Sequence, residues 1–439
     1  MRFCHSLDRR EVTFDDDHLV ANAGLILPAT LAQHLGLLDL FDEHVNLGEA
    51  KGRANVGHKA MTLIHSALAG GDSIEDADAL RAGDTQAVLG PVVLAPSTLG
   101  TFLRSFSWGH ARQLDVVAGD LLTRAWAAGA GPGEESFTID VDSSIHETYG
   151  LAKQGGTHFT YNHVRGYNPL YAVAAGTGDV LHVRLRGGNA NSGRGAASFL
   201  TETFGRVRTA GATGPIVLRA DSGFYAKSVV EACRRANVSF SITAKLVKGG
   251  VKTAIAAIDD SAWVAIPYFL DGADVAETTY QPFGAKGRPC RLIVRRVRPT
   301  PGSQLALFVE FTYHAFITDR EGEMVELEAD HRRHAEIENT IRDLKYGVGL
   351  NHLPSGRFGA NAAWLAFNVM AHNLARFCTR LGLGETLIRT ETLRRRYLSV
   401  PGRITNSARR RTIHLPTRWP WAQRFEDALR RHRSIVLVT

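Results

Sequence analysis

The order of strand-like and helix-like segments between residues 137 and 245 constrains the fold more than any other feature of this chain. Residues 137–144 (FTIDVDSS) alternate as a half-buried strand does, with Ile139 on one face and Asp140 and Asp142 on the other. Two more strands are expected around a Gly-rich turn, and after them helices and strands alternate. The expected segments are strands within 167–188 on either side of the turn 176–179, a helix at 193–211, a strand at 215–223, a helix at 225–237 and a strand at 238–245.

Three consecutive strands followed by alternating helices and strands predict an α/β fold, namely the ribonuclease H-like mixed sheet with helices on both faces. In that arrangement, acidic residues at the ends of the first and fourth strands lie side by side. Asp142 and Asp221 hold those two places here. Each also has a plainer explanation, a solvent-facing strand edge for Asp142 and a turn or helix cap for Asp221. Asp140 shares a face with Asp142 and is an alternative or additional ligand.

A third acidic residue is expected on a helix with the sequence HRRHAEIENTIRDLK, residues 331–345. Its buried stripe would be formed by Ile337, Ile341 and Leu344. The adjacent stripe would carry Glu338 with the side chains His331, His334 and Lys345. Glu336 lies roughly 200° around the helix from Glu338 and is the rival carboxylate. A solvated face with ion pairs between successive turns is the alternative explanation for so charged a helix.

Three converging carboxylates are suited to phosphodiester cleavage by two divalent metal ions. Hard cations such as Mg²⁺ prefer carboxylate oxygens, and two ions about 4 Å apart activate the nucleophile and neutralise charge on phosphorus. We therefore expect Asp142, Asp221 and Glu338 to hold two Mg²⁺ ions, with Mn²⁺ as a substitute. His331, His334, Arg342 and Lys345 would contact DNA phosphates. Both imidazoles should then have raised pKa values.

The positive charge of the chain lies at its C-terminal end. Residues 379–439 hold fourteen Arg, no Lys and four acidic residues, a net charge of +10 against +7 for the whole chain, so the rest carries −3. Arg suits phosphate contact, which favours DNA as the partner, although a solubilising tail is the alternative. The Arg clusters expected to contact DNA are Arg394, Arg395, Arg396, Arg409, Arg410 and Arg411.

Two further properties narrow the class of protein. The four Cys are far apart and form no Cys-x-x-Cys pair, so neither a zinc ribbon nor a disulfide framework is supported. The first residues are polar, and no stretch approaches 18 unbroken apolar residues. These features predict a cytoplasmic protein that is nucleoid-associated when it is bound to DNA.

The three acidic motifs, FTIDVDSS, VLRADSGFY and HRRHAEIENTIRDLK, resemble those of DDE transposases from bacterial insertion sequences, most closely the group numbered thirteen-eighty. The resemblance covers residues 137–377. Glu338 and Lys345 fall on the last two positions of that family's Y-x-x-R-x-x-x-E-x-x-x-x-x-x-K signature, and His331 and His334 replace its Tyr and Arg. The resemblance also implies a β-rich insertion in which an aromatic residue stacks on a flipped base. Trp263 is the candidate for that role, with a core position as the alternative.

The expected organisation follows from the resemblance and from the changes in sequence period. A helical domain would bind the terminal inverted repeats, with 96–107 either half of a helix-turn-helix or plain bundle core. The implied activity is cut-and-paste transposition by a homodimer on double-stranded DNA. The rivals are a ribonuclease H-like nuclease or resolvase, and an inactive DNA-binding remnant of a transposase. Residues 1–130 are expected to form the helical domain that binds the DNA ends. The catalytic core would consist of residues 131–245 and 321–378, and residues 246–320 between them would be a β-rich insertion or the continuation of the sheet. Residues 379–439 would form an Arg-rich tail.

Overall fold

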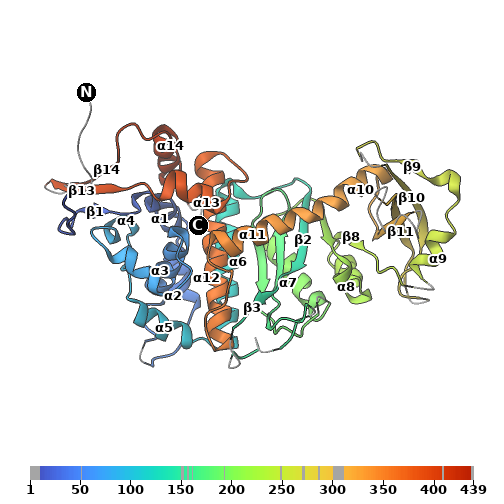
Figure 1. Cartoon of the computed structure of the whole chain (residues 1–439), viewed down its shortest axis with the longest axis horizontal. Coiled ribbons are helices and arrows are strands. Elements are labelled where there is room, and N and C mark those ends of the chain that lie inside the picture. Colours follow the sequence, from blue (N-terminus) through green and yellow to red (C-terminus); the bar gives the residue numbers. More distant parts are fainter. Residues whose placement is uncertain are drawn as a thin grey trace.

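A nine-stranded mixed sheet runs through the middle of the molecule, with helices gathered at one end and a β-rich region at the other (Figure 1). The computed structural model describes residues 10–50, 52–149, 153–155, 158–160, 162–191, 193–247, 250–268, 272–284, 287–299, 311–407 and 410–436. The strands, in their order across the sheet, are β6 (Val180–Arg184), β5 (Leu170–Ala174), β2 (Phe137–Ser143), β7 (Ile216–Ala220), β8 (Ser239–Thr243), β12 (Thr312–Thr318), β11 (Cys290–Val297), β10 (Ala273–Tyr280) and β9 (Val264–Ala265).

The centre of the sheet has the strand order that the sequence predicts. β2 pairs antiparallel with β5 and parallel with β7, and β7 pairs parallel with β8. Every residue of β5 and of β7 is buried, which explains why both are continuous runs rather than alternating ones. The protein is therefore a mixed α/β structure built on a large mixed sheet.

The β-rich region between β8 and α10 continues this sheet. β12 pairs antiparallel with β8, with Phe316 opposite Thr243, and β11, β10 and β9 follow outward. The outer strands have a small core of their own, which includes Val275, Ile293 and Leu327. Of the two possibilities left open by the sequence, the structure has the continuation of the sheet.

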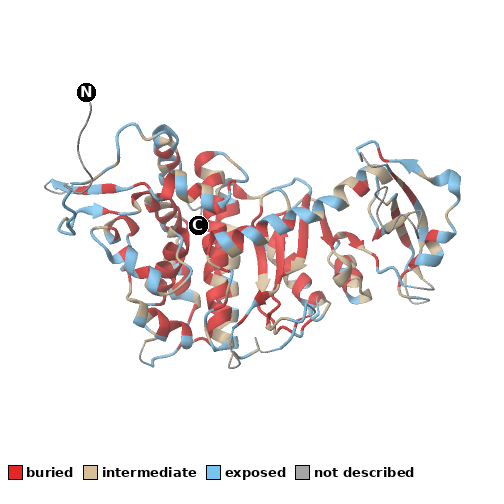
Figure 2. Ribbon diagram, viewed as in Figure 1, coloured by how far each residue is buried: buried red, intermediate tan, exposed pale blue. Residues whose placement is uncertain are grey.

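Helices cover the sheet and form the helical end. α11 (Ile337–Gly347) crosses the sheet at β2, and the longest helix, α12 (Phe358–Phe377), packs against α3, α5, α6 and β6. Burial is continuous through α12 and the central strands (Figure 2). The remaining helices considered below are α1 (Ile26–His34), α2 (Leu37–His44), α3 (Val56–Ala69), α5 (Pro96–Arg104), α6 (Trp108–Ala125), α7 (Ala196–Thr209), α8 (Lys227–Arg235), α9 (Val251–Ala256), α10 (Met324–Arg332) and α14 (Ala422–Arg433).

The described residues of the Arg-rich segment 379–439 are folded onto the rest of the molecule. α14 packs on α1, and buried Phe425 and His432 face the N-terminal helices and the segment after α12. A Cβ atom added at Gly24 would lie 1.7 Å from the carbonyl oxygen of Tyr397, so the two ends of the chain touch through their backbones. The segment is folded because its apolar residues, and not its Arg residues, decide where it lies.

Among the described residues, no single helix is long and apolar enough to cross a membrane, and only the bent pair Ala23–His34 with Leu37–His44 has the required length and composition.

Candidate active site

Asp142 and Asp221 leave the sheet at the same edge. β2 and β7 are parallel neighbours in which Val141 lies opposite Ala220, so the next residue of each strand is one of the two acids. Oδ1 of Asp142 accepts the N–H of Ser143 at 2.6 Å. Oδ1 of Asp221 accepts the N–H of Gly223 at 2.9 Å and so caps the short turn that follows β7. The plainer role considered for Asp221 is therefore present, and it uses one of the two carboxylate oxygens.

Glu338 approaches these acids from α11, whose two ends are tied to the segment that contains Asp142. His334 Nε2 donates to the carbonyl of Val141 at 3.1 Å, one helical turn before Glu338. Two turns after it, Lys345 Nζ donates to the carbonyl of Ile145 at 3.0 Å. Because Asp142 lies between those two carbonyls in the chain, α11 carries Glu338 past it. Glu338 itself is exposed.

The charge of the neighbouring carboxylates is visible in the titration of Asp142. Burial, together with the negative charges of Asp221 and Glu338, raises the pKa of Asp142 to about 6, against the lowering effect of the Ser143 N–H and of His334. Three negative groups therefore act on one another at this edge of the sheet. Binding a cation there would relieve their repulsion.

The donor set fits a hard divalent cation, because all three side chains offer carboxylate oxygens. Within the parts of the chain that the structure describes, no three His, Cys, Asp or Glu side chains are grouped closely enough to enclose one ion. Mg²⁺ does not require such a cage, since it commonly keeps several waters and takes one or two carboxylates together with substrate phosphates. Pairs drawn from Asp142, Asp221 and Glu338 are compatible with that mode of binding.

The expectation for His331 is wrong. The residues form α10, a 3₁₀ turn at Arg333–Glu336 and then α11, so His331 does not continue the stripe that contains Glu338. Its ring stacks on Phe316 of β12 at 4.1 Å, and its nitrogens bond the hydroxyl groups of Ser241 and Thr243. Burial lowers the pKa of His331 to about 3, opposite to the expected rise. His331 is neutral and connects α10 to the sheet.

Asp140 is engaged in a buried ion pair that the sequence analysis did not foresee. Arg219 of β7 binds both of its carboxylate oxygens, each at 2.8 Å, and also bonds Asp330 of α10 at 2.9 Å. Asp140 and Arg219 are almost fully buried, 2% and 1% exposed. This bidentate pairing leaves Asp140 without the free oxygens that an additional metal ligand needs. The signal in the sequence was a single Arg within an apolar strand, which requires a buried acidic partner.

The rival acid and two predicted DNA contacts lie elsewhere. Glu336 pairs with Arg333 at 3.0 Å and faces a cavity of about 800 Å³, which Arg342 also lines, whereas Glu338 lines a different one of about 410 Å³. Trp263 is half-buried under the guanidinium of Arg296, 4.4 Å from its ring centre. Its role toward a flipped base stays a prediction.

The C-terminal Arg residues divide into two groups. The expectation for Arg394 is wrong, since its guanidinium is half-buried and donates to the carbonyls of Leu68 at 2.8 Å, Ala67 at 3.1 Å and Gly347. Arg395 is exposed, as are Arg410 and Arg411 on β14 (Arg410–His414), which pairs with β13 (Gly402–Ser407). Arg396 is half-buried beside Trp421 at 5.6 Å, and Arg409 lies outside the described residues.

Comparison with protein families matches residues 5–436 to the family described as Transposase DDE domain group 1. No curated protein matches the chain. Among solved structures, a piggyBac transposase in a synaptic complex with hairpin DNA is similar, with a TM-score of 0.45 and 9% sequence identity over 86% of this chain and 79% of that one.

Proposed function

The chain belongs to the group 1 family of DDE transposase domains, and from that premise we propose that it performs cut-and-paste transposition. In this proposal the protein cleaves DNA at the two ends of a mobile element and joins the freed 3′ ends to target DNA. The element is a bacterial insertion sequence of the group numbered thirteen-eighty. The observation that carries the proposal is geometric: Asp142 and Asp221 stand at the carboxyl ends of the parallel neighbours β2 and β7, and α11 carries Glu338 past Asp142.

The arrangement of the central strands supports a ribonuclease H-like catalytic core. The first three strands of this sheet in chain order lie side by side as β6, β5, β2, and β7 and β8 extend the sheet in parallel on the other side of β2. A parallel pair places the carboxyl ends of both strands at one edge. Asp142 and Asp221 therefore come together from the topology alone, and α11 adds the third acid.

Each residue of the proposed site has its own part in the chemistry. Asp142 and Asp221 would hold Mg²⁺ from the sheet, and Glu338 would hold it from α11. When bound, such ions polarise the phosphate and generate the oxygen nucleophile at neutral pH. His334 and Lys345 position α11 through the carbonyls of Val141 and Ile145. The carboxylates stay ionised next to the cations although burial raises the pKa of Asp142.

The other parts of the chain would handle DNA. We place recognition of the terminal inverted repeats in the helices before residue 130, and a homodimer would bridge the two ends of the element. The exposed Arg410 and Arg411 of β14 would contact the backbone. Trp263 would stack on a base at the cleaved end.

The test is cleavage and strand transfer on a plasmid that carries the element ends, with Mg²⁺ or Mn²⁺. Asp142→Asn, Asp221→Asn and Glu338→Gln should each reduce cleavage to background, while binding to an end duplex stays within about threefold, because charge is lost only where the metal is held. Glu336→Gln is the matched control, since Glu336 pairs with Arg333 away from the site. Cleavage that survives Glu338→Gln but not Glu336→Gln would refute the assignment.

The same assay separates the rival functions. A nuclease or resolvase with this fold would cleave without joining the 3′ ends to target DNA. An inactive remnant would bind the end duplex and cleave with neither ion.

A further inference from the structure

A second concave surface lies between α8 and the loop that joins β10 to β11. This cleft has a volume of about 380 Å³ and contains four cationic side chains and one acidic one. The cations are Lys227, Arg234 and Arg235 of α8 and Arg288 of the loop, and the acid is Glu231. We call it the α8 cleft.

The positive charge of the α8 cleft is only partly compensated, by Glu231 in the cleft and by Asp319 near Arg234, which lowers the pKa of that carboxyl against the raising effect of burial. Lys227 and Glu231 form an exposed ion pair at 3.4 Å between successive helical turns, which contributes little free energy in water. Among the described residues, no carboxylate lies within ion-pair distance, 4.0 Å, of Arg234, Arg235 or Arg288. Arg234 instead lies over the ring of Phe240, 5.7 Å from its centre. Gathering these groups costs free energy through mutual repulsion, which an anionic ligand would remove.

Two of the cations, Lys227 and Arg234, lie on one face of a helix with Glu231 between them. Lys227, Glu231 and Arg234 follow one another at intervals of four and three residues, so they share a face. Seven residues at about 1.5 Å each separate Lys227 from Arg234 by roughly 11 Å. That length spans about three base steps at 3.4 Å per step along one strand of a duplex. Lys227 and Arg234 are therefore too far apart to bind one small anion together, and they suit separate phosphates of one strand.

The opposite wall of the cleft includes Phe283 and Pro282, which pack against the rest of the molecule. Phe283 has a left-handed backbone (φ 65°), which is unusual for a bulky residue, and its ring packs on Tyr225 at 5.0 Å. Pro282 beside it is buried. This contact places Phe283 beside the residues that precede α8, and Arg288 is exposed at the rim.

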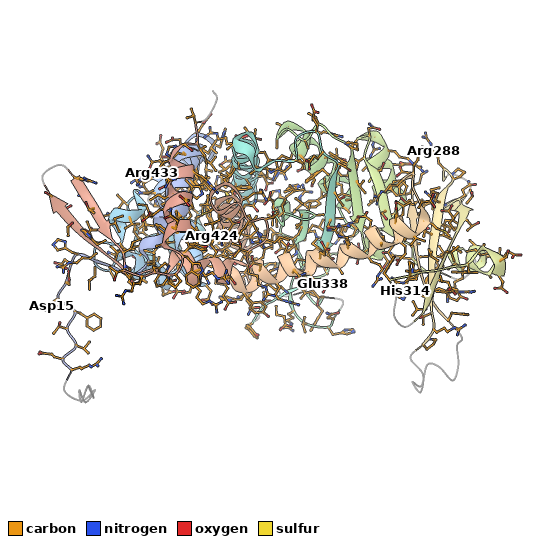
Figure 3. All side chains as sticks on the ribbon, turned by 90° about the horizontal axis from the view of Figure 1, so that it is seen from above. Asp15, Arg288, His314, Glu338, Arg424 and Arg433 are labelled. Carbon is orange, nitrogen blue, oxygen red and sulfur yellow. The ribbon has the colours of Figure 1, made fainter. Side chains whose placement is uncertain are left out.

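The α8 cleft is separate from the catalytic carboxylates but begins close to one of them. Lys227 follows Asp221 by six residues, directly after the turn that Asp221 caps. Arg288 and Glu338 lie on opposite sides of the sheet (Figure 3). A ligand in the cleft would therefore reach toward the edge that carries Asp221 without replacing anything held by Glu338.

We propose that the α8 cleft binds the sugar-phosphate backbone of DNA next to the cleavage site. This inference rests on the proposed function. Guanidinium groups offer paired N–H donors that match phosphate oxygens, and Arg supplies three of the four cations. One wall comes from the centre of the sheet and the other from its β-rich continuation. The outer strands of the sheet would then contribute directly to DNA binding.

The experiment measures how binding depends on salt for Arg235→Gln, Arg288→Gln and the double variant. Two duplexes of equal length are used, one with the element end and one of unrelated sequence as target DNA. Each lost phosphate contact should lower the slope of log affinity against log salt by about 0.9, and the double variant should lose about 1.8. If the slope falls on only one duplex, the cleft binds the backbone of that DNA alone, the element end or the target. If the slope falls on both duplexes, the cleft binds the backbone of either DNA.

Three controls keep the result interpretable. Lys252→Gln removes one exposed charge from α9, outside the cleft, and should leave the slope unchanged. Glu231→Gln should act in the opposite direction and strengthen binding, because it removes the only acidic group. Unchanged slopes on both duplexes for the double variant would overturn the inference while the proposed function stands. Failure of the unaltered protein to bind or cleave DNA would count against the function itself.

Discussion

The buried pair of Arg219 and Asp140 offers the sharpest prediction about stability. Arg219 makes two bonds to Asp140 and two to Asp330, one of them to its carbonyl at 2.7 Å, and both members of the pair are out of water. Arg219→Met would leave the Asp140 carboxylate buried and unpaired. Asp330 would keep its bond to Arg320 at 2.5 Å, so the damage is centred on Asp140.

The size of the effect follows from that geometry. Breaking a buried ion pair by removing one partner costs about 3–5 kcal/mol. Unfolding entropy is about 2.1 cal/mol/K per residue, which for 439 residues gives about 0.9 kcal/mol/K. The unfolding temperature of Arg219→Met should therefore fall by about 3–5 °C. Replacing both residues, as Asp140→Leu with Arg219→Met, should restore most of it, because an apolar pair leaves no unpaired charge.

Thermal unfolding followed by circular dichroism measures these shifts, and DNA cleavage is assayed on the same samples. Arg333→Ala is the matched control, since its pair with Glu336 has nearly the same length, 3.0 Å, but is exposed and should cost no more than about 1 kcal/mol. An Arg219→Met shift as small as that of Arg333→Ala would refute the reasoning. Cleavage lost in the folded double variant would return Asp140 to the list of metal ligands.

Two further predictions concern other parts of the chain. Arg394→Ala should destabilise the protein by about 1–3 kcal/mol in urea unfolding, because carbonyls of α3 and of Gly347 lose their donor. In contrast, the exposed pair Arg410→Gln with Arg411→Gln should leave stability unchanged and weaken DNA binding. Burial lowers the pKa of His65 to about 4 and that of His146 to about 3, whereas both imidazoles have the usual pKa of about 6.5 in the unfolded chain. The unfolded chain therefore takes up protons first, and the free energy of unfolding should fall by about 2 kcal/mol for each His as pH falls from 7 to 5. His65→Gln should flatten that dependence, and an unaltered slope would contradict it.

The centre of the fold could be predicted because its signals are local. Apolar runs, Gly-rich turns and helical periods mark β2, β5, β6, α7, β7, α8 and β8 within a few residues of their observed bounds. Strand order then follows from the small number of ways such a series can pack. The convergence of Asp142 and Asp221 needed only that order and the parallel register of β2 with β7.

The C-terminal segment shows where charge misleads. Fourteen Arg residues favoured a tail that binds DNA, with a solubilising tail as the alternative, yet Arg394 and Arg431 donate to buried carbonyls, and Phe425 lies in the main core. Charge count says nothing about where the long aliphatic part of an Arg side chain lies, and its head group can satisfy the ends of helices. Partners that are more than three hundred residues away, such as Leu68 for Arg394, leave no trace in the local pattern.

The helix that carries Glu338 shows how a distant strand can alter a local prediction. A continuous helix over 331–345 would place His331 in line with Glu338. Instead, the His331 ring stacks on Phe316 of β12 and bonds the hydroxyl groups of β8. Three contacts then hold the chain before Glu338: Arg219 with Asp330, Ser241 with His331, and His334 with the Val141 carbonyl. The first two connect α10 to β7 and β8, and the third connects the 3₁₀ turn between α10 and α11 to β2. Glu338 is exposed and makes few contacts of its own, so its position is determined by these neighbours, and a movement of the outer strands relative to β8 would reach it through α10.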